Sequence, residues 1–159
     1  MYIPFSKVHN IGFISTRFSG TDGVSLETEK WANVFEQERF HCFYFAGELD
    51  RDPAHAFRVP KAHFLEPEIR TIFNTAFGVS ANGVRERSLT TRIHEIKEHL
   101  KDQLYDFIAK FNIDLLIPEN AITIPLNIPL GLEITEVISA TRRPIIAHHH
   151  DFFWGRQGF

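Results

Sequence analysis

Residues 113–118, IDLLIP, lead into Glu119 and Asn120 and then into residues 121–138, AITIPLNIPLGLEITEVI. The first run is almost continuously apolar, which is typical of a strand covered on both faces. The second run is rich in apolar residues from residue 128 onward. Asn127 is suited to cap a helix there, with Pro129 in its first turn, so we expect a largely buried helix from Asn127 to about residue 140. A buried strand, a polar turn and a helix together form the repeating unit of parallel α/β sheets.

The same alternation extends through the rest of the chain. Further strands are expected at residues 11–16, 41–47 and 144–148, and helices at residues 24–39, 68–77 and 88–111. Residues 48–68 contain three prolines and predict an irregular excursion, with a very short strand at 57–59. This order predicts one α/β domain over residues 1–159, a Rossmann-like three-layer α/β/α sandwich with a mostly parallel sheet.

Charge and composition exclude several classes of protein. The chain carries 17 basic and 20 acidic residues, a net charge of −3, with no block of like charge. A general nucleic-acid or membrane-surface binder needs a concentrated basic face, so neither is expected. No apolar run approaches the length of about 18 residues that a transmembrane helix needs, and no signal peptide is recognisable. The single cysteine, Cys42, predicts no disulfide and a reducing, cytoplasmic location.

Polar or glycine-rich residues follow every expected strand. They are Ser15-Thr16-Arg17 with the turn SGTDG at 19–23, then Gly47-Glu48, then Glu119-Asn120, and finally His148-His149-His150-Asp151. Parallel α/β sheets bind ligands beyond the carboxyl ends of their strands. We therefore expect these clusters to meet along one edge and to form one wall of a binding cleft.

The turn SGTDGV, residues 19–24, joins a strand to a helix. Its glycines, Gly20 and Gly23, allow close backbone approach, and N–H groups at a helix start attract anions. Two interpretations stay open here, a plain tight turn or a phosphate or sugar contact. The turn does not match GxGxxG, which disfavours a nucleotide-dependent oxidoreductase.

The three consecutive histidines raise the question of a metal site. Neighbouring side chains on a strand point to opposite faces, so His148, His149 and His150 cannot all reach one ion without a bend. No thiol or carboxylate cluster is spaced to complete a site, and we expect no metal. One histidine should point into the cleft while its neighbours face helices. Asp151 is also suited to cap a helix beginning at Phe152.

Other polar residues at the strand ends are candidates for ligand contacts. Glu119 and Asn120 present a carboxylate and an amide suited to sugar hydroxyls, although an ordinary surface loop explains them equally simply. Arg17, Arg142 and Arg143 are candidate phosphate contacts, but the last two are better placed to cap the end of a helix. No pair of acids at a glycosidase spacing and no GxSxG nucleophile motif is present.

Three segments together resemble a known family. They are GTDGVSLETEKWA at 20–32, PENAITIPLNIPLGLEITEVI at 118–138, and PIIAHHHDFFWGR at 144–156. With the opening strand, they make residues from about 9 to 156 similar to the amino-terminal domain of family 4 retaining glycosyltransferases (glycosyl transferases group 1), which have the GT-B fold. The resemblance implies that the loop Gly20, Thr21, Asp22 and Gly23 lies near the donor diphosphate and the acceptor.

The resemblance also assigns a catalytic-site histidine and a set of partners. The family often has a strand ending in His-Asp whose histidine contacts the transferred sugar, and here His150, followed by Asp151, matches it. The implied substrates are a nucleotide-diphosphate-sugar donor and a sugar or glycoconjugate acceptor, with no further cofactor. Donor and acceptor contacts are expected from the loop at 20–23 and from Glu119, Asn120 and Asp151.

Such enzymes carry a second, carboxyl-terminal Rossmann-like domain with an EX7E-type motif, which this chain lacks. We therefore expect the chain to be either a piece of a longer enzyme or a natural half, and to be inactive alone. Phe152, Phe153 and Trp154 are expected to contact that second domain. A stand-alone Rossmann-like binding or regulatory module without catalysis is the alternative.

Overall fold

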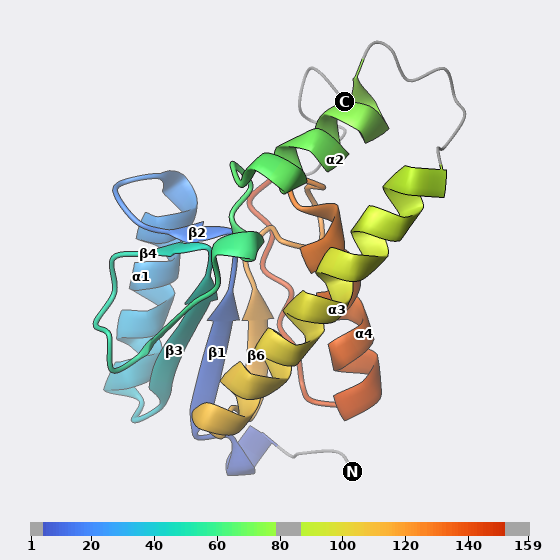
Figure 1. Cartoon of the computed structure of the whole chain (residues 1–159). Helices are drawn as coiled ribbons and strands as arrows, with labels where there is room; N and C mark the ends of the chain where they lie inside the picture. Colours follow the sequence, from blue (N-terminus) through green and yellow to red (C-terminus); the bar gives the residue numbers. More distant parts are fainter. Residues whose placement is uncertain (1–4, 79–86, 152–159) are drawn as a thin grey trace.

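The computed structural model describes residues 5–78 and 87–151. Its main sheet has four strands in the order β5-β3-β1-β6, and every neighbouring pair is parallel (Figure 1). The strands are β1 (Asn10–Ile14), β3 (His41–Ala46), β5 (Ala56–Arg58) and β6 (Leu115–Pro118). Two short strands, β2 (Arg17–Phe18) and β4 (Glu48–Leu49), form a separate parallel pair beyond the carboxyl ends of β1 and β3. The predicted α/β fold with a mostly parallel sheet is confirmed.

Helices cover both faces of this sheet, as Figure 1 shows. The α-helices are α1 (Gly23–Gln37), α2 (Pro67–Phe77), α3 (Arg87–Lys110) and α4 (Ile128–Thr141), and the short 3-10 turns are η1 (Phe5–Lys7) and η2 (Pro60–Ala62). None of the helices in the two described ranges is long and apolar enough to cross a membrane.

Alternating side chains of the strands supply two separate cores. In β1, Ile11 and Phe13 pack toward α1, whereas Ile14 packs toward α3 and α4. In β6, Leu115 and Ile117 belong to the core on the α1 side of the sheet. Leu116 belongs to the core on the side of α3 and α4. Because both faces are covered, each strand is apolar at nearly every position, which is the continuous pattern seen in the sequence.

Close packing requires glycine at one position within β1 and at one position just after β3. A Cβ atom at Gly12 would lie 2.8 Å from the ring of Phe107 in α3. At Gly47, which follows β3, a Cβ atom would lie 2.1 Å from the backbone nitrogen of His63. The chain after η2 therefore crosses directly over the end of β3, which brings residues 63 and 64 to the carboxyl edge of the sheet.

Two sequence-based expectations need correction. Residues 144–148 do not form a full strand but make two isolated parallel bridges, Leu116 with Ile145 and Glu119 with His148. The reason is Pro118, which has no N–H to complete the ladder between those bridges. Helix α4 is also less buried than expected, because Leu132 is 45% exposed. Its amino-terminal cap is confirmed, since the Asn127 side chain accepts a hydrogen bond from Leu130 N–H.

Candidate functional site

A cavity of about 440 Å³ opens at the carboxyl edge of the sheet. Its lining comes from the ends of β1 and β6, the start of α1, the 121–126 loop and the last histidine: Ser15, Thr16, Arg17, Asp22, Gly23, Val24, Phe64, Glu119, Asn120, Ala121, Ile124, Leu126, His150 and Asp151. The volume is in the range of small-molecule sites. The structure therefore brings six of the eight predicted site residues to one cavity, and Gly20 and Thr21 lie outside its lining.

The glycine-rich turn is held in place by the segment after β3. Gly20 has a positive φ of 73° and donates its N–H to Asp50 Oδ2 at 2.7 Å. The hydroxyl of Ser19 donates to Glu48. Since the N–H of Gly20 is already used and Thr21 is exposed, only the Asp22–Gly23 half of the turn faces the cavity.

Asp22 is an acid of the cavity wall with several partners. It caps α1 by accepting the N–H of Ser25, and it pairs with Arg17 at 3.1 Å. Partial burial works to raise the pKa of Asp22, but the hydrogen bonds from Ser25 and the nearby Arg17 outweigh it and hold that pKa below its usual value. The Arg17 guanidinium also lies over the ring of Phe64, 5.6 Å from its centre. This arrangement keeps the Arg17 guanidinium at the amino-terminal end of α1, where an anionic ligand is favoured.

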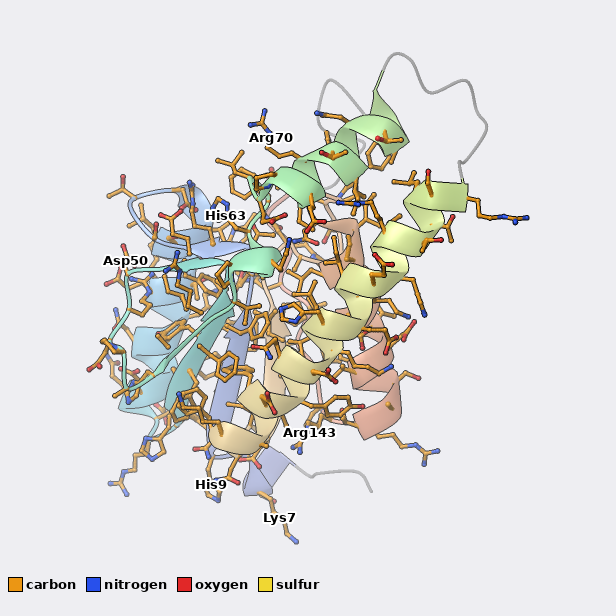
Figure 2. The ribbon with its side chains drawn as sticks, viewed as in Figure 1. Lys7, His9, Asp50, His63, Arg70 and Arg143 are labelled. Carbon is orange, nitrogen blue, oxygen red and sulfur yellow. The ribbon has the colours of Figure 1, made fainter. Side chains whose placement is uncertain are left out.

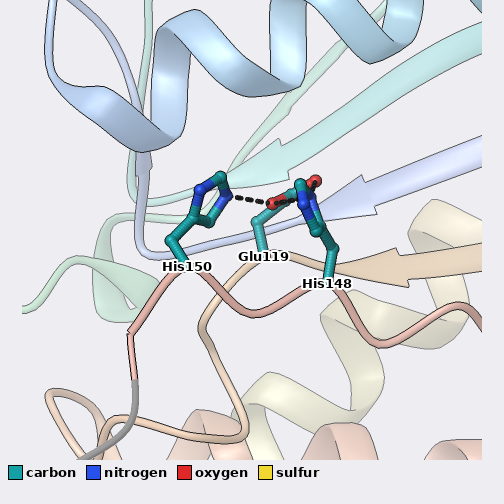
Figure 3. Close-up of side chains that lie close together, drawn as sticks. All are labelled: Glu119, His148 and His150. Carbon is teal, nitrogen blue, oxygen red and sulfur yellow. Dashed lines mark hydrogen bonds and ion pairs between the residues drawn. The ribbon is translucent and has the colours of Figure 1, made fainter. Parts of the chain in front are cut away.

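Glu119, His148 and His150 form a compact group, here called the Glu–His–His cluster (Figure 3). The Glu119 side chain is 0% exposed, and those of His148 and His150 are 19% and 22% exposed. His148 Nδ1 and His150 Nε2 each lie 2.9 Å from Glu119 Oε2. Glu119 is therefore not a surface-loop residue: it lines the cavity, and its carboxylate is directed to the two histidines.

Both histidines are fixed in position. The ring of His148 stacks on Trp31 of α1, with ring centres 4.3 Å apart. The backbone N–H of His148 donates to the carbonyl of Pro118, and the N–H of His150 donates to Asn120 Oδ1 at 2.8 Å. Asn120 thus uses its side-chain oxygen to hold the histidine segment rather than leaving it open to a ligand.

The middle histidine turns away from the cluster. His149 Nδ1 contacts the hydroxyl of Thr123 in the loop before α4. Burial, with repulsion from the neighbouring His148, lowers the pKa of His149. His150 lines the cavity and His148 stacks on Trp31 of α1, yet both rings point to Glu119. Only His149 points the other way, which is the alternation expected of a strand-like backbone. Asp151 lines the cavity, and its expected role as a cap for Phe152 lies outside the described residues, as do Phe153 and Trp154.

The two arginines after α4 are not among the residues that line the cavity. Arg142 ends α4 in a left-handed conformation, and Arg143 donates to the carbonyl of Ile113, two residues before β6. Figure 2 shows Arg143 near His9, at the end opposite His63 and Asp50. Arg17 is the one of the three candidate phosphate contacts that reaches the cavity.

Sequence reasoning missed Phe64 and Trp31 as site residues. Phe64 reaches the cavity only because the 48–66 excursion folds back over Gly47, and Trp31 supports His148 from α1. With 16 phenylalanines in the chain, no local signal separates Phe64 from the residues of the core.

Fold and cavity together define a Rossmann-like α/β domain with a ligand-sized site at the carboxyl ends of its strands. The chain is 25% identical over 146 residues to mannosylglucosylglycerate synthase of Petrotoga mobilis, and 28% identical over 147 residues to the protein of the same name from Thermotoga maritima. Each match covers 92% of this chain and 33% of the relative, so the chain spans about a third of their length. No protein-family model matches, and no solved structure gives a significant match. These similarities support a relationship to glycosyltransferases.

Proposed function

We propose that this chain is the amino-terminal domain of a GT-B, family 4 glycosyltransferase that transfers a sugar from a nucleotide-diphosphate donor with retention of configuration. The similarity to two synthases over 92% of the chain carries the proposal, and the cavity at the strand ends supports it. The chain spans a third of those relatives, so we further propose that a carboxyl-terminal domain supplies the other wall of the cleft.

In this proposal His150 contacts the sugar being transferred. Its Nε2 faces Glu119, which leaves Nδ1 to meet a sugar hydroxyl. Arg17, beside the start of α1, stabilises the charge that develops on the departing diphosphate. Asp22, Gly23 and Asp151 contact donor or acceptor groups in the same cavity. The bond from the anomeric carbon to the diphosphate oxygen breaks, the acceptor oxygen bonds to that carbon on the same face, and the proton of the acceptor hydroxyl passes to the departing diphosphate.

The test uses the natural protein that contains this chain. Both relatives are named for a product that joins mannose, glucose and glycerate, so nucleotide-linked mannose with glucosylglycerate is the first pair to assay. GDP-, UDP- and ADP-sugars are then compared as donors. The expected result is sugar transfer with retained anomeric configuration, which NMR of the product detects. Donor binding without any transfer would instead support the alternative of a binding module.

Replacement of His150 by alanine tests the site assignment. Loss of one donor to a charged transition state costs about 100-fold or more in kcat, so turnover should fall by at least that factor. His99→Ala is the matched control, because His99 is exposed on α3 and outside the cavity lining. Near-normal turnover in His150→Ala would remove His150 from the mechanism.

A further inference from the structure

We propose that the Glu–His–His cluster is a binding site for a divalent transition-metal ion such as Zn²⁺. Local spacing does not predict such a site, because no carboxylate cluster lies at a suitable distance from the histidines along the chain. The structure supplies that carboxylate from a neighbouring segment, 29 residues before His148 and 31 before His150.

The donor set fits this class of ion. Two imidazoles and one carboxylate are typical ligands of zinc and its neighbours, whereas Mg²⁺ and Ca²⁺ prefer oxygen alone. One ligand atom from each of Glu119, His148 and His150 lies within 4.8 Å of the others. Ligands about 2.0–2.1 Å from a tetrahedral zinc lie about 3.3 Å apart, so small side-chain rotations bring these atoms to coordination distance.

Burial of Glu119 is the second observation. A carboxylate with 0% side-chain exposure needs compensating positive charge. Within residues 5–78 and 87–151, no lysine or arginine forms an ion pair with Glu119, and the two histidines are its partners. A divalent ion would neutralise Glu119 while using the same three side chains.

The surroundings hold the ligands rigidly. His148 is stacked on Trp31, and the backbone of His150 is bound to the side chain of Asn120. The parallel bridge between Glu119 and His148 sets two ligands side by side, and His150, two residues on, lies on the same side of the chain. Such support orients ligands before the ion arrives. Since Glu119 and His150 also line the cavity, the ion would lie in its wall.

The test is direct titration of the tag-free 159-residue chain with Zn²⁺ by isothermal titration calorimetry, with Mg²⁺ in parallel. We expect one equivalent of tightly bound Zn²⁺ and much weaker binding of Mg²⁺. Co²⁺ should bind as well and quench Trp31, because this indole stacks on a ligand. No sugar donor is needed, so the outcome is independent of the proposed transferase function.

Glu119→Gln keeps the shape of the side chain but removes its charge, and it should weaken Zn²⁺ binding by more than about 100-fold, beyond the loss typical of residues that only support a ligand. His99→Gln, on the exposed face of α3, is the control and should bind like the parent chain. If Glu119→Gln does not fold, His150→Gln and the position of zinc in anomalous diffraction of the parent chain decide the question. Equal affinity in parent and variants, absence of saturable binding, or zinc located at other histidines would overturn the proposal.

Discussion

Asn120 links the two segments of the site, and its replacement tests how firmly they are joined. The residue has a φ of 57°, in the left-handed region, and its side-chain oxygen accepts the N–H of His150 at 2.8 Å. Asn120→Ala removes that acceptor, at about 1 kcal/mol, and places an alanine in a left-handed conformation, at about 1 kcal/mol more. We expect the free energy of unfolding to fall by about 2 kcal/mol.

Two further variants separate these contributions. Asn120→Gly tolerates the backbone conformation, so it should lose mainly the hydrogen bond and be less destabilised than the alanine variant. Asn112, at the end of α3, also has a positive φ, 48°, and no hydrogen bond of its side chain is seen in the described part of the chain. Asn112→Ala is therefore the matched control for the conformational cost alone.

Urea unfolding monitored by circular dichroism measures the free energy of unfolding of all three variants. For a chain of this size, a loss of about 2 kcal/mol lowers the midpoint of thermal unfolding by about 4–8 °C. If Asn120→Ala is no less stable than Asn112→Ala, the hydrogen bond to His150 contributes nothing and our account of how the histidine segment is held is wrong.

Three other substitutions test separate parts of the structure. Gly47→Ala places a methyl group against the backbone of His63, which cannot move aside. The free energy of unfolding, measured by urea denaturation, should therefore fall by about 3 kcal/mol. Glu133 is fully buried, its oxygens have no hydrogen-bond partner among residues 5–78 and 87–151, and burial raises the pKa of its carboxyl. The folded state therefore binds a proton more tightly than the unfolded one, and the destabilisation grows as pH rises above the unfolded pKa of 4.5. Glu133→Met should be more stable than the parent by about 1–3 kcal/mol at pH 7, with a smaller gain at pH values well below 4.5, where the carboxyl is protonated; an equal gain at both pH values would contradict this reasoning. Asp22→Ala removes the cap of α1 and should cost about 1 kcal/mol at pH 7. Because the folded-state pKa of Asp22 is lowered, part of that cost should be lost as pH falls through and below 3.8, which thermal unfolding at several pH values would show.

Much of the fold follows from local sequence patterns. Continuous apolar runs mark β1, β3 and β6, and three- and four-residue spacing marks α3, because burial on one or both sides of an element leaves a periodic trace in the chain. The cap at Asn127 and the gathering of polar residues at the carboxyl edge are also predictable, since caps are local and parallel strands all end on one side.

Local sequence patterns do not predict the partners of the site residues, because those partners depend on which backbone segments lie next to one another. Glu119 meets His148 and His150 only through the pairing of two chain segments about 30 residues apart. Gly20 has its N–H occupied by Asp50, on a segment that no local pattern links to the turn. The sequence by itself determined the elements, their order and the edge where a ligand would bind. Tertiary structure alone decided which side chains face the cavity and which are held by one another, because neighbours in space are set by strand register and chain crossings rather than by spacing along the chain.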